Sequence, residues 1–257
     1  MTSSEIRSKA RESLTNKWGK AALIAFCYFI IEFLISSIIS GAEESLPIIS
    51  LLFNIGNIVI SVPLSYGIII SYMKLKRSEE VKAFDFLTDG FSNFGKAWGV
   101  TWNIVKKMIL PIILIVVIYI LLSLSITFAM TFSLFKVSSS SFPIFLTVLC
   151  TLALIGIYIW AAIKYLLYVL SYQIAYDNPN YSNKDVVEES ERLMNGNRGK
   201  YFVLQLSFIG WGILACLTFG IGTFWLTPYM TVAAICFYEN LSGKYNSTAT
   251  VDSEEVE

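Results

Sequence analysis

The chain has 257 residues, of which 55% are hydrophobic and only 15% charged, and its mean hydropathy is +0.63. Soluble domains usually carry about 25% charged residues, so this composition excludes an ordinary soluble domain and indicates a membrane protein. Lys and Arg together number 19, as do Asp and Glu, so the net charge is zero and we expect no nucleic-acid partner.

Long apolar runs follow one another along the chain, and six of them are found, at 21–40, 46–73, 108–133, 143–172, 201–218 and 224–241. Each is near or above the roughly 20 residues that a helix needs to cross the hydrocarbon core. Their apolar character is continuous and not alternating, which favours helices over the strands of a barrel. The sequence therefore predicts an all-α polytopic membrane protein, with six transmembrane helices forming three hairpins in one domain over 1–242.

Orientation follows from the basic residues that flank the runs. Seventeen Lys and Arg residues lie on one side of the predicted membrane, against Lys136 alone on the other. Basic residues favour the cytoplasmic side, so we expect both termini in the cytoplasm of a bacterial cell and a plasma-membrane location. The first run is too long for a signal peptide and carries Glu32. The acidic tail, 243–257, is expected to be disordered.

A short pattern recurs before each hairpin, as NKWGK at 16–20, NFGK at 93–96 and NRGK at 197–200. We interpret it as an interfacial joint in which Gly permits a turn and Lys stays among the lipid headgroups. The joint residues share this Gly-Lys pair; they are Gly19, Lys20, Gly95, Lys96, Gly199 and Lys200.

An amphipathic segment precedes each joint. Ile6, Ala10, Leu14 and Trp18 recur every four residues, and Phe84, Leu87, Phe91, Phe94 and Trp98 recur every three or four. Such helices are suited to lying in the headgroup plane. The predicted unit is thus a cytoplasmic amphipathic helix, a joint and a hairpin, in units of about 1–75, 79–176 and 182–242. Internal repetition and convergent boundary chemistry both remain open explanations.

The sequence lacks the residue patterns that are typical of common enzyme active sites. The stretch GFSNFGKA (90–97) lacks the final Ser or Thr of a phosphate-binding loop and follows no apolar strand. The chain has no histidine, and no cysteine pair has metal-ligand spacing. We therefore expect neither an enzyme nor a cofactor or metal site.

Two charged residues lie inside the apolar runs, one in the first run and one in the fourth. Glu32 and Lys164 lie at comparable predicted depths, and charges in the membrane are usually paired or face a polar cavity. We hypothesise that they form an ion pair between the first and fourth spans. The alternative is that Lys164 extends to the cytoplasmic surface and Glu32 is neutral or paired elsewhere.

The last third of the chain carries a specific signature, reading LSFIGWGILACLTFGIGTFWLTPY and then FYENL. It resembles domain-of-unknown-function family nine-seven-five, a bacterial family of uncharacterised integral membrane proteins, and the resemblance implies a polytopic membrane protein without an established activity. Small residues in lipid permit close helix packing or a tight turn, and a proline inside a helix frees a carbonyl. The helix-packing and turn candidates are Gly210, Gly212, Gly220, Gly222, Pro228 and Tyr229; a ligand site at the bend at 228–229 is the alternative.

Three function classes remain open, and the third, an intramembrane enzyme, is disfavoured by the lack of histidine. The first is a non-catalytic scaffold or accessory subunit of the cell envelope, which includes a self-protection role against a secreted toxin. The second is a transporter or lipid-handling protein that uses Glu32 and Lys164. The expected partners are membrane lipids and, for the first class, another membrane protein.

Overall fold

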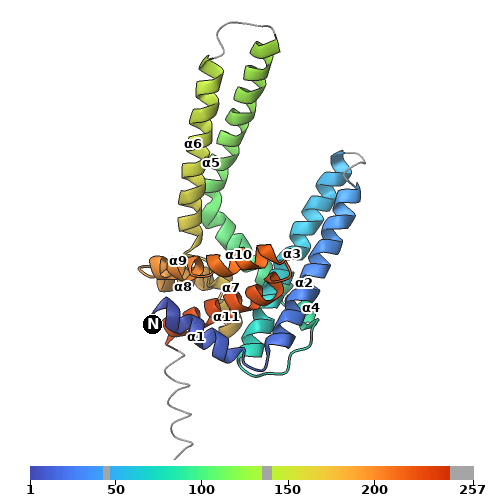
Figure 1. The fold of residues 1–257 in the computed structure, drawn as a ribbon, viewed down its shortest axis with the longest axis vertical. Coiled ribbons are helices and arrows are strands. Elements are labelled where there is room, and N and C mark those ends of the chain that lie inside the picture. The colour runs from blue at the N-terminus through green and yellow to red at the C-terminus, as the bar shows by residue number, and fades with distance from the viewer. Residues whose placement is uncertain (43–46, 135–140, 244–257) are drawn as a thin grey trace, which may run out of the picture.

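The computed structural model describes residues 1–42, 47–134 and 141–243, and every regular element in those ranges is a helix. Two long hairpins rise from a base of shorter helices (Figure 1). The hairpins are α2 (Trp18–Ala42) with α3 (Pro47–Lys76), and α5 (Phe94–Leu134) with α6 (Ser141–Tyr165). The base holds α1 (Ser3–Ser13), α4 (Asp85–Ser92), α7 (Ser171–Asp177), α8 (Asn183–Met194), α9 (Arg198–Leu206), α10 (Ile209–Leu217) and α11 (Thr223–Ser242). Apart from Gly243, the predicted acidic tail lies outside the described residues.

Helices of membrane-spanning length are present. Five segments in the described ranges are long and apolar enough to cross a membrane, namely Trp18–Ile38, Leu51–Lys76, Phe94–Thr131, Phe142–Tyr165 and Arg198–Leu217. They coincide with the first five predicted runs, so the all-helical fold with several candidate spans is confirmed.

The sixth predicted run differs from the other five. It falls on α11, which is not among the candidate spans, and residues 232–238 of α11 are all buried by the protein itself. The fifth run is interrupted, because α9 ends at Leu206 and α10 begins at Ile209. In Figure 1, α9, α10 and α11 lie across the base and not alongside the hairpins. The third hairpin is therefore built differently from the first two.

The amphipathic helix α1 turns its apolar face toward the protein. A capping box of Thr2 and Glu5 begins the helix. Ile6, Ala10 and Leu14 are then buried against the base, where α1 packs on α11 and α9. α8 behaves in the same way, since Val186, Val187, Leu193 and Met194 are buried. The expectation that these faces lie on lipid headgroups is wrong for α1 and α8, because protein already covers them.

α4 packs on α3 at very short range. A Cβ on Gly67 would lie 1.9 Å from the carbonyl oxygen of Phe86, and one on Gly90 would lie 2.3 Å from the carbonyl oxygen of Pro63. Only glycine fits at such contacts, since real Cβ atoms do not approach backbone so closely. Gly90 opens the stretch GFSNFGKA, which is helical on both sides of Asn93. The first glycine of this stretch thus serves the packing of α4 on α3.

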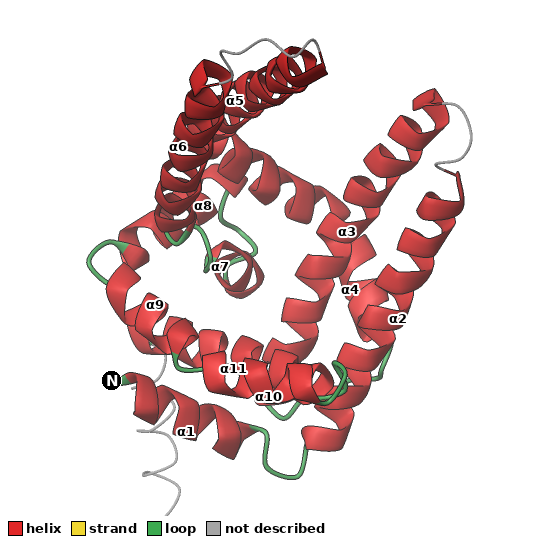
Figure 2. Cartoon of the chain, turned by 45° about the horizontal axis from the view of Figure 1, so that its top comes forward, coloured by secondary structure: helices red, strands yellow, loops and turns green. Residues whose placement is uncertain are grey.

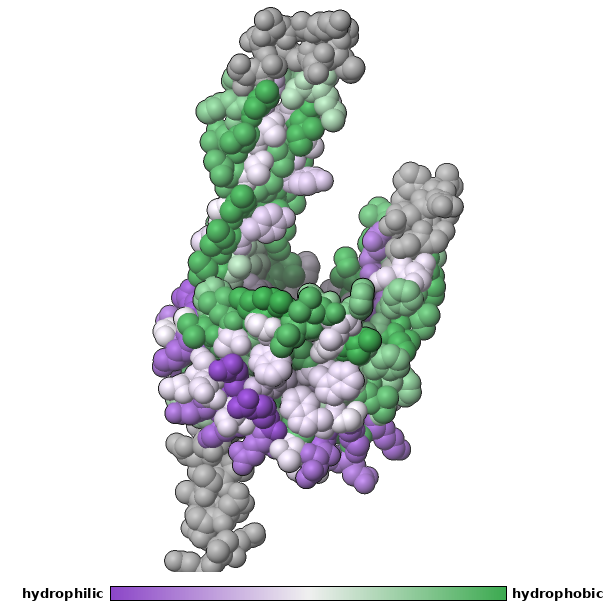
Figure 3. Space-filling model, in the orientation of Figure 1, coloured by the Kyte–Doolittle hydropathy of each residue, from purple (hydrophilic) through white to green (hydrophobic). Residues whose placement is uncertain are grey.

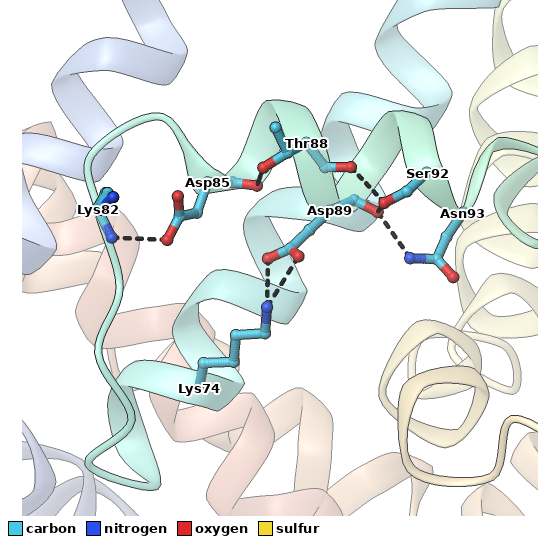
Figure 4. A network of polar contacts seen from close by, with 7 residues as sticks. All are labelled: Lys74, Lys82, Asp85, Thr88, Asp89, Ser92 and Asn93. Atoms are coloured by element: carbon cyan, nitrogen blue, oxygen red, sulfur yellow. Dashed lines mark hydrogen bonds and ion pairs between the residues drawn. The ribbon is translucent and has the colours of Figure 1, made fainter.

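Polar contacts fix the same pair of helices. In Figure 4, the ammonium group of Lys74 on α3 lies 2.8 Å from both carboxylate oxygens of Asp89 on α4. At the end of α4, the amide nitrogen of Asn93 donates to the carbonyl of Asp89 (2.9 Å). At its start, the carboxylate of Asp85 accepts from the backbone N–H of Lys82 (2.8 Å). The short helix is thereby held at both ends and along its length.

The fourth predicted run is broken near its end. α6 stops at Tyr165, and a turn over 166–170 precedes α7. Within this turn the N–H of Tyr168 bonds to the carbonyl of Tyr165 (2.9 Å), and the hydroxyl of Ser190 on α8 donates to the carbonyl of Leu167 (2.7 Å). The break allows α7 to enter the middle of the base, where Figure 2 shows it enclosed by other helices.

Candidate functional site

A cavity of about 740 Å³ lies in the base, at the feet of both hairpins. Its walls come from α2, α3, α5, α9 and α11, together with the end of α6, the turn after it and the start of α7. Of these helices, α3, α5, α9 and α11 surround α7 in Figure 2. The site is thus assembled from nearly the whole length of the chain.

The lining of this central cavity combines apolar side chains with uncharged polar ones. None of its lining residues is Asp, Glu, Lys or Arg among those that the structure describes. The polar members are Tyr28, Ser65, Thr101, Tyr165, Tyr168, Ser171, Tyr172, Gln173, Tyr201, Gln205, Thr227 and Thr231. Such a lining suits a ligand without net charge that offers both apolar surface and a few hydrogen-bonding groups.

The start of α7 carries several of these polar groups. The hydroxyl of Tyr172 lies 2.7 Å from that of Thr101 on α5, and its ring centroid lies 5.1 Å from that of Tyr66 on α3. Gln173, turned so that its amide nitrogen donates, bonds to the carbonyls of Val169 (3.2 Å) and Leu170 (3.1 Å). These bonds tie the side chain of Gln173 to the end of the turn over 166–170, where the carbonyl of Leu170 also accepts the N–H of Ile174 (3.0 Å).

Ser171 presents an unused polar group to the cavity. Its side chain is buried, it lines the cavity, and its hydroxyl has no hydrogen-bond partner. Because buried polar groups are nearly always hydrogen-bonded, a lone hydroxyl in a cavity wall is an expected contact point for a ligand. Ser71 on α3 is likewise buried and unpartnered, but it does not line the cavity.

The tyrosines of the base keep their protons near neutral pH. Burial, with a further contribution from the nearby Glu191 carboxylate, raises the pKa of Tyr168 to about 12. Burial also raises the pKa of Tyr172, although its contact with Thr101 acts in the opposite direction. The hydroxyl of Tyr168 bonds to the carboxylate of Glu191 (3.2 Å). The tyrosine part of the cavity wall therefore remains uncharged.

A charge cluster lies farther along the same helices. α3, α7 and α11 all run from the cavity toward it, and it contains Lys76, Arg77, Asp177 and Glu239. Arg77 lies 2.7 Å from Asp177, whose side chain is only 2% exposed, and 3.9 Å from Glu239. Lys76 pairs with Glu239. This cluster, residues 76, 77, 177 and 239, ties together the ends of three helices that are far apart in the sequence.

The charge cluster also affects Tyr238. Burial and the adjacent Asp177 carboxylate raise the pKa of Tyr238. Burial opposes the charge of Arg77, but the combined attraction of Asp177 and Glu239 is stronger, so the pKa of Arg77 is raised as well. Near neutral pH the guanidinium of Arg77 therefore stays positively charged, and the phenol of Tyr238 stays neutral.

The predicted ion pair of Glu32 and Lys164 is not formed. Glu32 lies in α2, where its carboxylate is 3.3 Å from the hydroxyl of Ser61 on α3. Lys164 lies in the other hairpin, with its ammonium group 5.7 Å from the ring centroid of Trp160 on its own helix. The two hairpins stand apart in Figures 1 and 2. Equal predicted depth did not place the two helices side by side.

The predicted turn between α10 and α11 contains the expected small residues. Gly220 has a φ of +86°, and a Cβ on Gly222 would lie 2.8 Å from the Cα of Ala215. A Cβ on Gly210 or Gly212 would meet nothing within 4 Å, so neither glycine makes a close contact. Two of the four glycines thus have a visible role in this turn.

Tyr229 is a structural residue of the base. It is buried, its ring centroid lies 4.9 Å from that of Phe208 and 6.0 Å from that of Trp18, and its hydroxyl donates to the carbonyl of Arg7 (3.4 Å). Tyr229 therefore packs inside the base, in keeping with a helix-packing role. Pro228 is buried beside it, and neither residue lines the cavity, although their neighbours Thr227 and Met230 do.

The three joints are helix starts. In each copy the Gly-Lys pair forms the second and third residues of a helix, α2, α5 or α9. A Cβ on Gly19, Gly95 or Gly199 would meet nothing within 4 Å, and none of the three has a positive φ. The turn instead uses a left-handed backbone at Asn16 (φ 62°) and Gly196 (φ 80°). The interpretation that this Gly makes the turn is wrong.

The remaining joint residues contact the protein. The amide nitrogens of Asn93 and Asn197 each donate to the carbonyl four residues earlier, and so close α4 and α8. The ammonium group of Lys96 bonds to the carbonyls of Pro179 and Tyr181, and that of Lys200 to the side-chain oxygen of Asn197. Lys20 lines a small pocket of about 200 Å³. Contact of these lysines with headgroups stays a prediction.

Sequence reasoning missed the cavity and the charge cluster. The described residues contain no group of three or more His, Cys, Asp or Glu placed to hold a metal ion. One signal for the cluster was available, because Tyr-Asp at 176–177 and Tyr-Glu at 238–239 each follow an apolar stretch. No comparable signal marks the cavity, whose residues are scattered over six segments.

Comparison with known proteins agrees with the signature in the last third of the chain. No curated protein and no solved structure matches the chain. A family model with the description "Protein of unknown function (DUF975)" matches residues 1–245, which is almost the whole length. The chain therefore belongs to the DUF975 family.

Proposed function

We propose that this protein is a membrane protein that binds an uncharged amphiphile, such as a neutral lipid, in the central cavity. The observation that carries the proposal is the cavity itself, with its uncharged lining and the unpartnered hydroxyl of Ser171. Its volume of about 740 Å³ falls within the roughly 300–1,000 Å³ of typical ligand sites. This function belongs to the lipid-handling class.

The surface supports a membrane placement in which both hairpins span the bilayer of a bacterial cell. The hairpins are green with apolar side chains in Figure 3, whereas hydrophilic residues gather on the underside of the base. Exposed apolar residues of this kind include Phe33, Tyr119 and Phe145. With the basic flanks on the base side, the base and both termini face the cytoplasm, and the cavity lies at the cytoplasmic feet of the spans.

In this placement α9, α10 and the turn before α11 lie in the membrane interface and do not span it. Phe219, in that turn, is 99% exposed, and Leu217 and Ile221 beside it are exposed as well. Apolar side chains on the hairpin side of α9 and α10 continue the apolar surface of the hairpins in Figure 3. The topology then comprises four spanning helices and one interfacial hairpin.

Thiol labelling tests this topology. We expect Phe219→Cys, in a chain with Cys216→Ala, to resist a membrane-impermeant maleimide added to the outside of intact cells. Ala42→Cys, at the last residue of α2 and thus at the end of the hairpin far from the base, is the positive control and should react. Outside labelling at both positions would instead restore the six-span arrangement.

The cavity predicts a preference for neutral over anionic lipid. In polymer nanodiscs analysed by native mass spectrometry, we expect added diacylglycerol to be retained in preference to phosphatidylglycerol, because the lining offers hydroxyls and no cation. Ser171→Ala should lower diacylglycerol retention about 3- to 10-fold, the effect of one lost hydrogen bond.

Ser71→Ala is the matched control, because Ser71 is equally buried and unpartnered but lies outside the cavity. It should leave diacylglycerol retention unchanged. Equal effects of both substitutions would remove Ser171 as a ligand contact, and equal retention of both lipids would contradict a site for neutral amphiphiles.

A role as scaffold or accessory subunit is the second candidate. It is favoured by the aromatic residues at and around α4. Phe91 of α4, Phe84 before it and Phe94 at the start of α5 are exposed, whereas Phe86 is buried. A protein partner that remains at fixed stoichiometry in the same native spectra, and that is lost on Phe91→Ser, would support this second role.

A further inference from the structure

Polar residues repeat along the facing sides of α2 and α3. On α2 they are Tyr28 and Glu32, and on α3 they are Asn57, Ser61 and Ser65, each spaced by four residues. Side chains four apart share one face of a helix, so the spacing lines each helix with oxygen atoms along the same strip. Figure 3 shows a hydrophilic patch on the side of this hairpin that faces α5 and α6.

The Ser61 hydroxyl in this strip has more acceptor neighbours than hydrogens to donate. The Ser61 hydroxyl lies 3.0 Å from the side-chain oxygen of Asn57 and 3.3 Å from one carboxylate oxygen of Glu32. A hydroxyl has a single hydrogen, so it satisfies only one of the two. The other carboxylate oxygen of Glu32 is buried and has no hydrogen-bond partner. The hydroxyl of Tyr28 interacts with Glu32 as well, but the single hydrogen of Ser61 cannot satisfy both of its acceptor neighbours.

No nearby basic residue balances the carboxylate. Among the described residues Glu32 makes no ion pair, and Lys164 lies in the other hairpin. The titratable group facing Glu32 is Tyr28 on its own helix; α3 offers Asn57, Ser61 and Ser65, and α11 packs on α2 through Phe224. A charge inside the membrane is costly unless it is compensated.

We propose that Glu32, Ser61 and Asn57 bind one monovalent cation of the size of Na⁺. One carboxylate with neutral oxygens matches a single positive charge. Divalent ions favour further carboxylates or retained waters. In the described part of the chain, no three His, Cys, Asp or Glu residues lie close enough together to hold a metal ion. Oxygens that hold an ion of this size at about 2.3–2.6 Å stand roughly 3.3–3.7 Å apart. The separation of Ser61 from Glu32, 3.3 Å, lies at the lower end of this range, and Asn57, at 3.0 Å from Ser61, would have to move outward by a few tenths of an ångström (~0.3 Å).

The cation site adjoins the central cavity. Tyr28 and Ser65 line the cavity, and each lies one helical turn from Glu32 or Ser61. The proposed cation site therefore lies within about one helical turn of the polar side chains of the cavity wall. The proposal does not rest on the cavity having a lipid occupant, because the ion ligands belong to the hairpin alone.

Thermal unfolding of the full chain in lipid nanodiscs tests the site. We expect the midpoint Tm to rise in NaCl relative to choline chloride at equal ionic strength, by roughly 5 °C at a hundredfold excess over the dissociation constant. The rise should saturate with Na⁺ concentration. Glu32→Gln and Asn57→Leu should each abolish the difference between the two salts.

Lys164→Gln is the control, because it alters the other charge of the spans without touching the strip, and it should keep the full Na⁺ response. Equal Tm in both salts for the unaltered chain would overturn the proposal. So would a Tm that follows pH and not Na⁺ and loses this dependence in Glu32→Gln, because Glu32 would then carry a proton. The lipid-retention experiment is separate, so either proposal can fail alone.

Discussion

Replacing Gly67 by Ala is expected to lower the free energy of unfolding by about 3 kcal/mol, the upper end of the range for overpacked cores, or to prevent folding. The added Cβ would lie 1.9 Å from the backbone oxygen of Phe86 and 2.9 Å from the backbone nitrogen of Gly90. Backbone cannot move aside as a flexible side chain can, so α4 must separate from α3. Differential scanning fluorimetry of the purified chain measures the loss.

Gly56→Ala is the matched control for this substitution. Gly56 lies in the same helix, but its Cβ would meet nothing within 4 Å. Ala is preferred over Gly inside a helix by about 1 kcal/mol, so the control should be neutral or stabilising. If Gly67→Ala were as stable as Gly56→Ala, α3 and α4 would not pack as described.

Asp177→Asn should be the second severe substitution, with a loss of about 3 kcal/mol in the free energy of unfolding. Breaking a buried ion pair costs roughly 3–5 kcal/mol, because the remaining charge stays buried. We expect the lower end, since Glu239 still lies 3.9 Å from Arg77. Chemical denaturation in nanodiscs measures the change, and the double variant with Arg77→Gln should recover part of it.

The control for Asp177→Asn is Glu188→Gln. Glu188 pairs with Lys184 at 3.5 Å, but both side chains are largely exposed, at 47% and 73%. Surface pairs of this kind contribute about 0.5 kcal/mol or less. Similar losses for the two substitutions would show that the charge cluster does not hold the base together.

The helical membrane fold could be predicted because long apolar runs have one physical solution in lipid. The same reasoning expected α11 to span, and its composition does resemble a span. α11 is buried instead by α1, α2 and α3, which pack on it. Hydropathy reports that a residue avoids water, but it does not say whether lipid or protein replaces the water.

The candidate site was harder to predict for a different reason. The depth of Glu32 along its helix could be estimated from the rise per residue, but its neighbours depend on which helices pack together. α2 pairs with α3, so Glu32 contacts Ser61 and not Lys164. Ser171 and Tyr172 were placed inside a span, because the turn over 166–170 contains only apolar and aromatic residues and no Gly or Pro.

The order of contacts around the base makes the molecule a closed circuit. The segment α1–α3 contacts α4–α7 through α3, the latter contacts α8–α11 through α5 and α7, and α11 returns to α1, α2 and α3. In a linear array the end units have one neighbour and can fray independently. Here each segment has two neighbours, so the loss of any one segment removes two of the three contacts. The base should therefore unfold in a single cooperative transition, with no stable fragment of one or two segments.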